Sequence, residues 1–124
     1  MAFIASFRDL EVYKLARDHA KKVFEITITF PKEEKYSLTD QIRRSSRSVS
    51  ANIAEGYRKR QYPNAFVSKM ADADGEGAET QGWIDYARDC GYWSPELAAE
   101  FTAGNEEVGR MLGGMIAHPE KFAI

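Results

Sequence analysis

Apolar side chains recur every three or four residues along nearly the whole chain, and no stretch keeps the alternation typical of a half-buried β-strand. The first such stretch spans about residues 9–29, and Asp9 stands where it could cap a helix. It stops before Pro31, because the residue preceding a proline is pushed out of helical geometry. Its buried face is predicted to hold Val12, Tyr13, Ala16, Ala20, Val23 and Phe24.

A second apolar stripe follows Ser37-Leu38-Thr39-Asp40, which has the form of a capping box. It continues at helical spacing until Tyr62-Pro63-Asn64 breaks the chain. Ser46, Ser50 and Gly56 lie beside the stripe. Such small residues predict close approach of a neighbouring helix, although glycine has a helix propensity about 1 kcal/mol below that of alanine.

Two further helical segments are predicted in the second half. The third spans about residues 63–90, and it is the least regular because Gly75, Gly77 and Gly82 interrupt a thin apolar stripe before Gly91 ends it. The fourth begins at Ser94-Pro95, a capping serine before a first-turn proline, and reaches about residue 116. Four amphipathic helices with short connections predict an all-α, antiparallel up-and-down four-helix bundle, one domain over residues 1–124.

Composition fits a single domain in a reducing compartment. A chain of 124 residues can bury roughly two thirds of its unfolded surface, enough for one core. No apolar run approaches the ~18 to 20 residues of a membrane span, so no membrane partner is expected. Cys90 is the one cysteine and cannot form an internal disulfide, which favours a cytoplasmic location. Its place at the end of an apolar face predicts a buried, unreactive thiol.

Charge is unevenly distributed along the chain. Residues 1–60 hold 13 Lys and Arg against 8 Asp and Glu, whereas residues 61–124 hold 4 against 11, and the formal net charge is −2. This asymmetry predicts that the two halves face each other, within one bundle or across subunits. The alternative is a basic patch left exposed on an acidic molecule.

Several short motifs occur together in an order that points to one family. They are Phe7-Arg8-Asp9-Leu10, Phe30-Pro31, Gln41-Ile42-Arg43-Arg44, Asn52-Ile53-Ala54-Glu55-Gly56 and Gly91-Tyr92. The chain thereby resembles the bacterial four-helix-bundle family encoded in intervening sequences of large-subunit ribosomal RNA genes, also called the S23 ribosomal protein family. The resemblance implies a small up-and-down bundle that assembles as a ring-shaped homopentamer. Related accessory proteins of diversity-generating retroelements bind nucleic acid and partner a reverse transcriptase.

The second segment carries the candidate nucleic-acid contacts. Six cations lie on it or at its end: Arg43, Arg44, Arg47, Arg58, Lys59 and Arg60. Contacts from these side chains to the phosphates of RNA or DNA would be strongly salt dependent. The alternative is ion pairing with acidic helix faces, together with a helix end whose cations complement the dipole.

The third segment carries a carboxylate stripe. Asp72, Glu76 and Glu79 are spaced by four and three residues, so they share a helix face. One interpretation is a metal-dependent enzyme, but bundles of that kind use Glu-x-x-His pairs, which this chain lacks. The other is a salt-bridged stripe facing Arg43 and Arg47, or the equivalent residues of a neighbouring subunit. We therefore predict neither metal nor cofactor.

The run Asn52-Ile53-Ala54-Glu55-Gly56 is interpreted as a packing and assembly element. Asn52 and Glu55 can hydrogen-bond across helices, and Gly56 permits close backbone contact. The sequence as a whole favours a non-enzymatic, self-assembling binding or scaffold module, and RNA or DNA is the favoured ligand. A protein–protein adaptor that uses the acidic second half stays open as the alternative.

Overall fold

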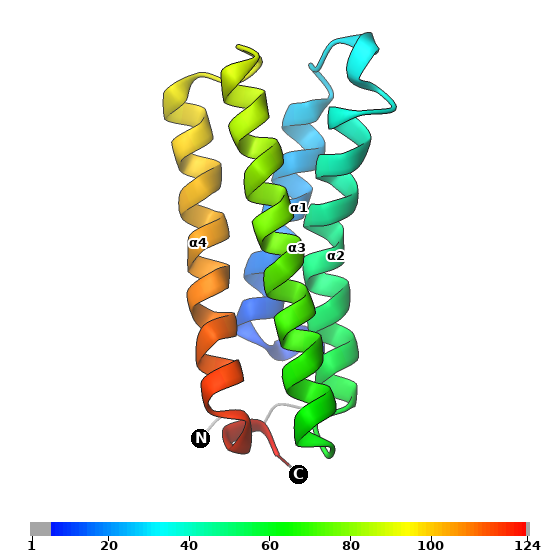
Figure 1. The fold of residues 1–124 in the computed structure, drawn as a ribbon, viewed down its shortest axis with the longest axis vertical. Coiled ribbons are helices and arrows are strands. Elements are labelled where there is room, and N and C mark those ends of the chain that lie inside the picture. Colours follow the sequence, from blue (N-terminus) through cyan, green and yellow to red (C-terminus); the bar gives the residue numbers. More distant parts are fainter. Residues whose placement is uncertain (1–5, 124) are drawn as a thin grey trace.

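Four long helices make up the fold in the computed structural model, which describes residues 6–123. They are α1 (Glu11–Thr27), α2 (Leu38–Arg58), α3 (Pro63–Asp89) and α4 (Pro95–Ala117), joined or flanked by the 3-10 turns η1 (Phe7–Asp9), η2 (Lys32–Glu34) and η3 (Pro119–Phe122). Consecutive helices run antiparallel, and α1 also packs on α4, which closes the bundle (Figure 1). No strand occurs within residues 6–123, so the prediction of an all-α fold is confirmed. Residues 1–5 and 124 of the predicted domain lie outside the described part.

The boundaries of α3 and α4 follow the sequence signals. The Ser94 hydroxyl accepts a hydrogen bond of 3.1 Å from the Leu97 N–H, and Pro95 occupies the first position of α4. Gly91 adopts a φ of 76°, the left-handed conformation that ends a helix and that glycine adopts most easily. Despite its three glycines, α3 is one continuous helix of 27 residues.

Two predicted caps are wrong. Asp9 lies in η1, whose cap is Ser6, and α1 begins only after Leu10. Ser37 does precede α2, but its hydroxyl donates a 2.6 Å hydrogen bond to the Glu34 carboxylate instead of accepting one from the helix. In each case the predicted cap residue is instead part of the 3-10 turn before the helix, or hydrogen-bonded to it.

The core consists of two apolar clusters stacked along the bundle axis. One is built around Ile53, Phe66 and Met70, the other around Ile42 and Ile84. Burial of each such side chain contributes about 1.5 to 3 kcal/mol. Between the clusters along α2 and α3 lies a polar layer, in which the Thr80 hydroxyl donates to the Ser45 hydroxyl at 2.8 Å with both residues fully buried.

Helices α2 and α3 approach closely at Gly56, which is buried, as predicted. The two predicted serines do not show this contact: Ser46 is buried and Ser50 half-buried, and each donates a hydrogen bond to a carbonyl of α2 itself. A Cβ added at Gly56 would lie 2.7 Å from Met70 Cε and 3.0 Å from Lys69 Cβ. Met70 Cε is the end of a flexible side chain, whereas Lys69 Cβ is attached to the α3 backbone and would have to give by a few tenths of an ångström. The missing side chain of Gly56 therefore permits the close contact between the two helices.

Two other features bear on the predictions made from composition. Over the described residues, no helix combines the length and apolar character that crossing a membrane would need. Cys90 is exposed, so the prediction of a buried thiol is wrong. The residue caps α3, where the chain has already turned away from the apolar face.

Candidate nucleic-acid interface

Arg43 and Arg47 lie over one aromatic ring on α1. Their guanidinium carbons are 4.7 and 5.5 Å from the centroid of Phe24. Arg43 Nε also donates to the Thr27 hydroxyl at 2.8 Å. Phe24 was expected in the core but is 40% exposed, because it lies at the seam between α1 and α2. These are cation–π contacts, which hold the guanidinium in place without neutralising its charge.

Two further arginines lie over a second aromatic ring, near the start of α1. Arg58 and Arg8 lie 5.8 and 4.8 Å from the centroid of Phe7. Phe7 packs edge-on against Tyr13 at 5.0 Å, and the Tyr13 hydroxyl accepts a 3.1 Å hydrogen bond from Arg17. Arg58, Arg8 and Arg17 thus gather around one aromatic pair.

The two groups of arginines belong to one side of the bundle. Arg47 and Arg58 are eleven residues apart, which on a helix is close to three full turns and about 16 Å. Both therefore face α1. We call this surface the α1–α2 arginine face; its members are Arg8, Arg17, Arg43, Arg47 and Arg58. Among the ion pairs of the described residues none involves a member of this face, whose contacts are to rings, hydroxyls and a backbone carbonyl.

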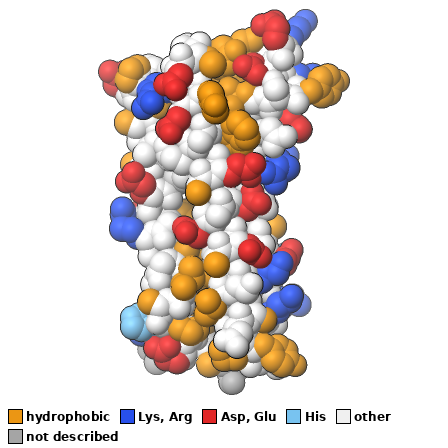
Figure 2. All heavy atoms as spheres, in the orientation of Figure 1, with side chains coloured by type: hydrophobic (Ala, Val, Ile, Leu, Met, Phe, Trp, Pro, Cys, Tyr) orange, Lys and Arg blue, Asp and Glu red, His pale blue; other side chains and the backbone are white. Residues whose placement is uncertain are grey.

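Arg44 has a different environment from its neighbours. Its guanidinium forms an ion pair with Glu79, and its second terminal nitrogen lies 3.6 Å from Glu76 Oε2. The pairing with Glu79 raises the pKa of Arg44, and burial raises the pKa of Glu76. Acidic side chains over α3 accordingly lie beside cations at the α2 edge (Figure 2).

The predicted partners of the carboxylate stripe are therefore wrong in part. The stripe faces Arg44, not Arg43 and Arg47, because Arg44 is rotated by about 100° toward α3. Asp72 is exposed and forms no ion pair with a described residue. Within residues 6–123, no group of three or more His, Cys, Asp or Glu side chains is placed to hold a metal ion.

The last two predicted cations lie at the end of α2. Lys59 is exposed. Arg60 covers the Tyr57 ring, with its guanidinium carbon 3.9 Å from the centroid, and donates to the Tyr57 carbonyl at 3.0 Å. Arg60 thus satisfies one of the last carbonyls of the helix, as the alternative interpretation of this cluster expected.

The Asn52–Gly56 run serves packing, although not in every detail predicted. Asn52 donates to the Ser48 carbonyl at 2.9 Å within α2, so the predicted bond across helices is wrong. Glu55 does reach across, with a 2.8 Å ion pair to Lys69 on α3 that lowers the pKa of Glu55. With Gly56 it fixes how α2 and α3 pack.

Sequence reasoning missed Arg8, Arg17 and the role of Phe24. A signal for two of them was present. Arg17 and Phe24 are seven residues apart, which places them on one face of a helix. The contact of that face with α2 depends on the pairing of helices, which periodicity does not give.

The geometry defines a helical bundle with one basic face. A model of the 23S rRNA-intervening sequence protein family matches residues 8–114, and the chain belongs to this family. The chain is also similar in fold to a crystal structure of a protein with unknown function from the S23 ribosomal protein family of Bacteroides thetaiotaomicron. The TM-score is 0.75 at 22% identity, over 85% of this chain and 97% of that chain. No curated protein gave a significant match.

Proposed function

We propose that the chain is a non-enzymatic, cytoplasmic binding module whose α1–α2 arginine face contacts the phosphates of nucleic acid. One observation carries the proposal: the five arginines rest on rings and hydroxyls and have no carboxylate partner among the described residues. Guanidinium groups held in this way retain donors and full charge for phosphate.

The aromatic rings add a second mode of contact. Phe24 is partly exposed beside Arg43 and Arg47. Bases of a single strand can stack on the guanidinium planes that cover this ring, and this mode tolerates any sequence. The two arginine groups, about 16 Å apart along α2, would contact phosphates at separate points on one strand. Arg44 and Arg60 are committed to internal contacts, and Lys59 lies near Glu55, which pairs with Lys69 on α3.

We also propose that several copies assemble, as a ring-shaped homopentamer. Repetition of the face would give avidity that one chain of net charge −2 lacks. Gly75 and Gly82 support close contact with another subunit, because they lie two turns apart on α3 and an added Cβ at either would meet nothing within 4 Å. Internal packing thus gives no reason for glycine there. Light scattering coupled to gel filtration measures the number of copies.

Charge variants test the nucleic-acid proposal. Fluorescence anisotropy with labelled single-stranded and duplex RNA and DNA gives the affinity across a salt titration. Replacement of Arg43, Arg47 and Arg58 by Ala removes up to three phosphate contacts, so the slope of log K against log salt should fall by about 2 for single strands. Arg44→Ala is the control for each single Arg→Ala replacement: it removes one positive charge from the same helix and should leave the slope unchanged.

Two results would overturn the proposal. The first is no binding at low salt by a folded, assembled wild-type protein. The second is an Arg44→Ala variant that loses as much affinity as the variants on the α1–α2 arginine face. The second result would place the ligand on the side of the bundle formed by α2 and α3.

A further inference from the structure

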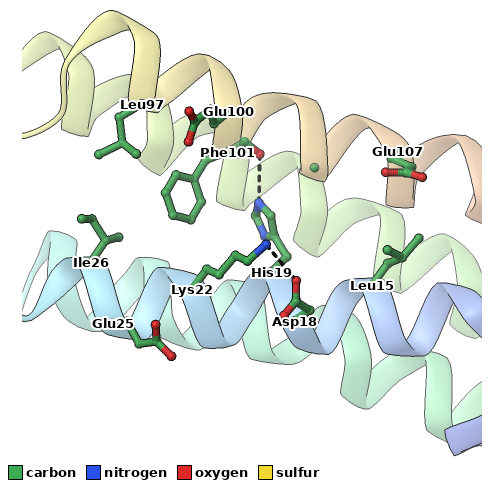
Figure 3. A pocket seen from close by; sticks show the side chains of 11 residues that line it. Leu15, Asp18, His19, Lys22, Glu25, Ile26, Leu97, Glu100, Phe101 and Glu107 are labelled. Atoms are coloured by element: carbon green, nitrogen blue, oxygen red, sulfur yellow. Dashed lines mark hydrogen bonds and ion pairs between the residues drawn. The ribbon is translucent and has the colours of Figure 1, made fainter.

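A groove of about 510 Å³ runs between α1 and α4, on the other side of α1 from the arginine face. Its floor is apolar, with Leu15 and Ile26 from α1 and Leu97 and Phe101 from α4 (Figure 3). Ile26 follows Phe24 by two residues, about 200° around the helix. A ligand in this α1–α4 groove would therefore not cover the arginine face.

The middle of the groove is preformed. Two contacts hold the His19 ring in place. Its Nε2 forms a 2.9 Å hydrogen bond with the Phe101 carbonyl, and the ring packs edge-on against the Phe101 ring at 5.6 Å. Since a carbonyl only accepts, Nε2 carries the proton. Gly104 provides the room for the imidazole, because a Cβ there would lie 2.9 Å from His19 Cδ2. The floor thus has a fixed shape between the two helices.

The rim of the groove is acidic. Glu100 and Glu107, seven residues apart on α4, form no ion pair with any described residue. On α1, Asp18 is paired with Lys22 at 3.0 Å, and Lys22 is the one cation lining the groove. Glu25 adds another carboxylate, which lies 4.0 Å from Lys21 Nζ, outside the groove lining. Carboxylates thus outnumber cations along the whole groove, and those on α4 are left without a partner charge.

We propose that the α1–α4 groove binds a cationic amphipathic helix of a partner polypeptide. Leu15 and Ile26 are eleven residues apart, so the floor is about 16 Å long and accommodates roughly three turns of helix. The apolar side chains of the partner would lie on the floor, and its Lys and Arg side chains would meet Glu100 and Glu107. Charge complementarity selects this occupant, because an acidic or neutral helix would leave the rim carboxylates facing no cation.

A pair of synthetic helical peptides tests this proposal. One carries Leu at positions i, i+3, i+4 and i+7 with Lys elsewhere, and the other replaces every Lys by Glu. Binding of the fluorescein-labelled peptides to the full chain is measured by anisotropy. The Lys peptide should bind and the Glu peptide should not. Replacement of Glu100 and Glu107 by Gln should weaken binding on the order of ten-fold, since each rim charge contributes modestly.

Glu106→Gln is the matched control, because Glu106 neighbours Glu107 but lines a different depression, between α3 and α4. It should leave peptide binding unchanged. No binding of the Lys peptide by the wild type, or equal weakening by Glu106→Gln, would overturn the proposal. So would a drop in oligomer size when Glu100 and Glu107 are changed to Lys, because a second copy of the chain would then be the occupant of the groove.

Discussion

Replacement of Arg44 by Ala separates structural from ligand-binding arginines on α2. The side chain of Arg44 is 48% exposed, and those of its partners Glu76 and Glu79 are 26% and 35% exposed. At this exposure the pairs are closer to surface ion pairs, which contribute about 0.2 to 1 kcal/mol each. Fully buried pairs are different, because breaking one costs about 3 to 5 kcal/mol. For two carboxylates we expect a loss of about 0.4 to 2 kcal/mol in the free energy of unfolding near neutral pH.

The loss should shrink as the pH falls. Burial raises the pKa of Glu76, and the charge of Arg44 opposes that rise. Without Arg44 the folded protein takes up a proton on Glu76 more readily than the unfolded chain does, and the variant therefore gains stability relative to wild type on acidification. Urea denaturation followed by far-UV circular dichroism, at pH 7.5 and pH 5, gives both free energies. A double-mutant cycle with Glu79→Gln gives the interaction free energy between Arg44 and Glu79.

The nucleic-acid affinity of Arg44→Ala should equal that of the wild type. The reasoning fails if the variant keeps full stability but binds RNA or DNA as poorly as Arg43→Ala and Arg47→Ala together. Arg44 would then be free in solution to meet a ligand, and its contacts with Glu76 and Glu79 would not persist.

Three further changes probe the helices themselves. Gly113→Ala should raise the free energy of unfolding by about 1 kcal/mol, because alanine favours a helix and its Cβ meets no atom within 4 Å. A decrease in urea denaturation would reveal close contact with another body. Thr80→Val should lower it by about 1 to 2 kcal/mol through loss of the buried bond to Ser45, and an unchanged midpoint would contradict that role. Burial lowers the pKa of His19 below its ordinary value of 6.5. As the pH falls, His19 is therefore protonated in the unfolded chain before it is protonated in the folded protein, and the free energy of unfolding decreases below about pH 6.5. His19→Gln should flatten this decline between pH 7.5 and 5.5, and equal slopes for both proteins would show that His19 does not titrate with unfolding.

Helical periodicity and the strong stop signals predicted most of the fold. Pro31, Pro63 and Ser94-Pro95 mark real helix boundaries, because proline geometry and a serine cap act locally. Asp9 and Ser37 failed as caps because each lies beside a short 3-10 turn that takes the contacts instead. Turns of three residues have no periodicity to detect.

The candidate site was predicted as a set of residues but not as a surface. The six cations on α2 and at its end could not be assigned to different roles from spacing alone, because their roles depend on which helix lies beside each. Arg44 faces α3 and its carboxylates, whereas Arg43 and Arg47 face Phe24 on α1. Arg8 joins the site only because η1 folds back against α2. These pairings are properties of the packed bundle.

The most direct test of the nucleic-acid proposal is ultraviolet cross-linking of the assembled protein to labelled single-stranded RNA, with the attached peptides identified by mass spectrometry. We expect cross-links to the peptides of α1 and α2 that contain Phe24 and Arg47. These should be lost at high salt. Cross-links confined to α3 and α4, or none under conditions where the RNA is bound, would contradict it.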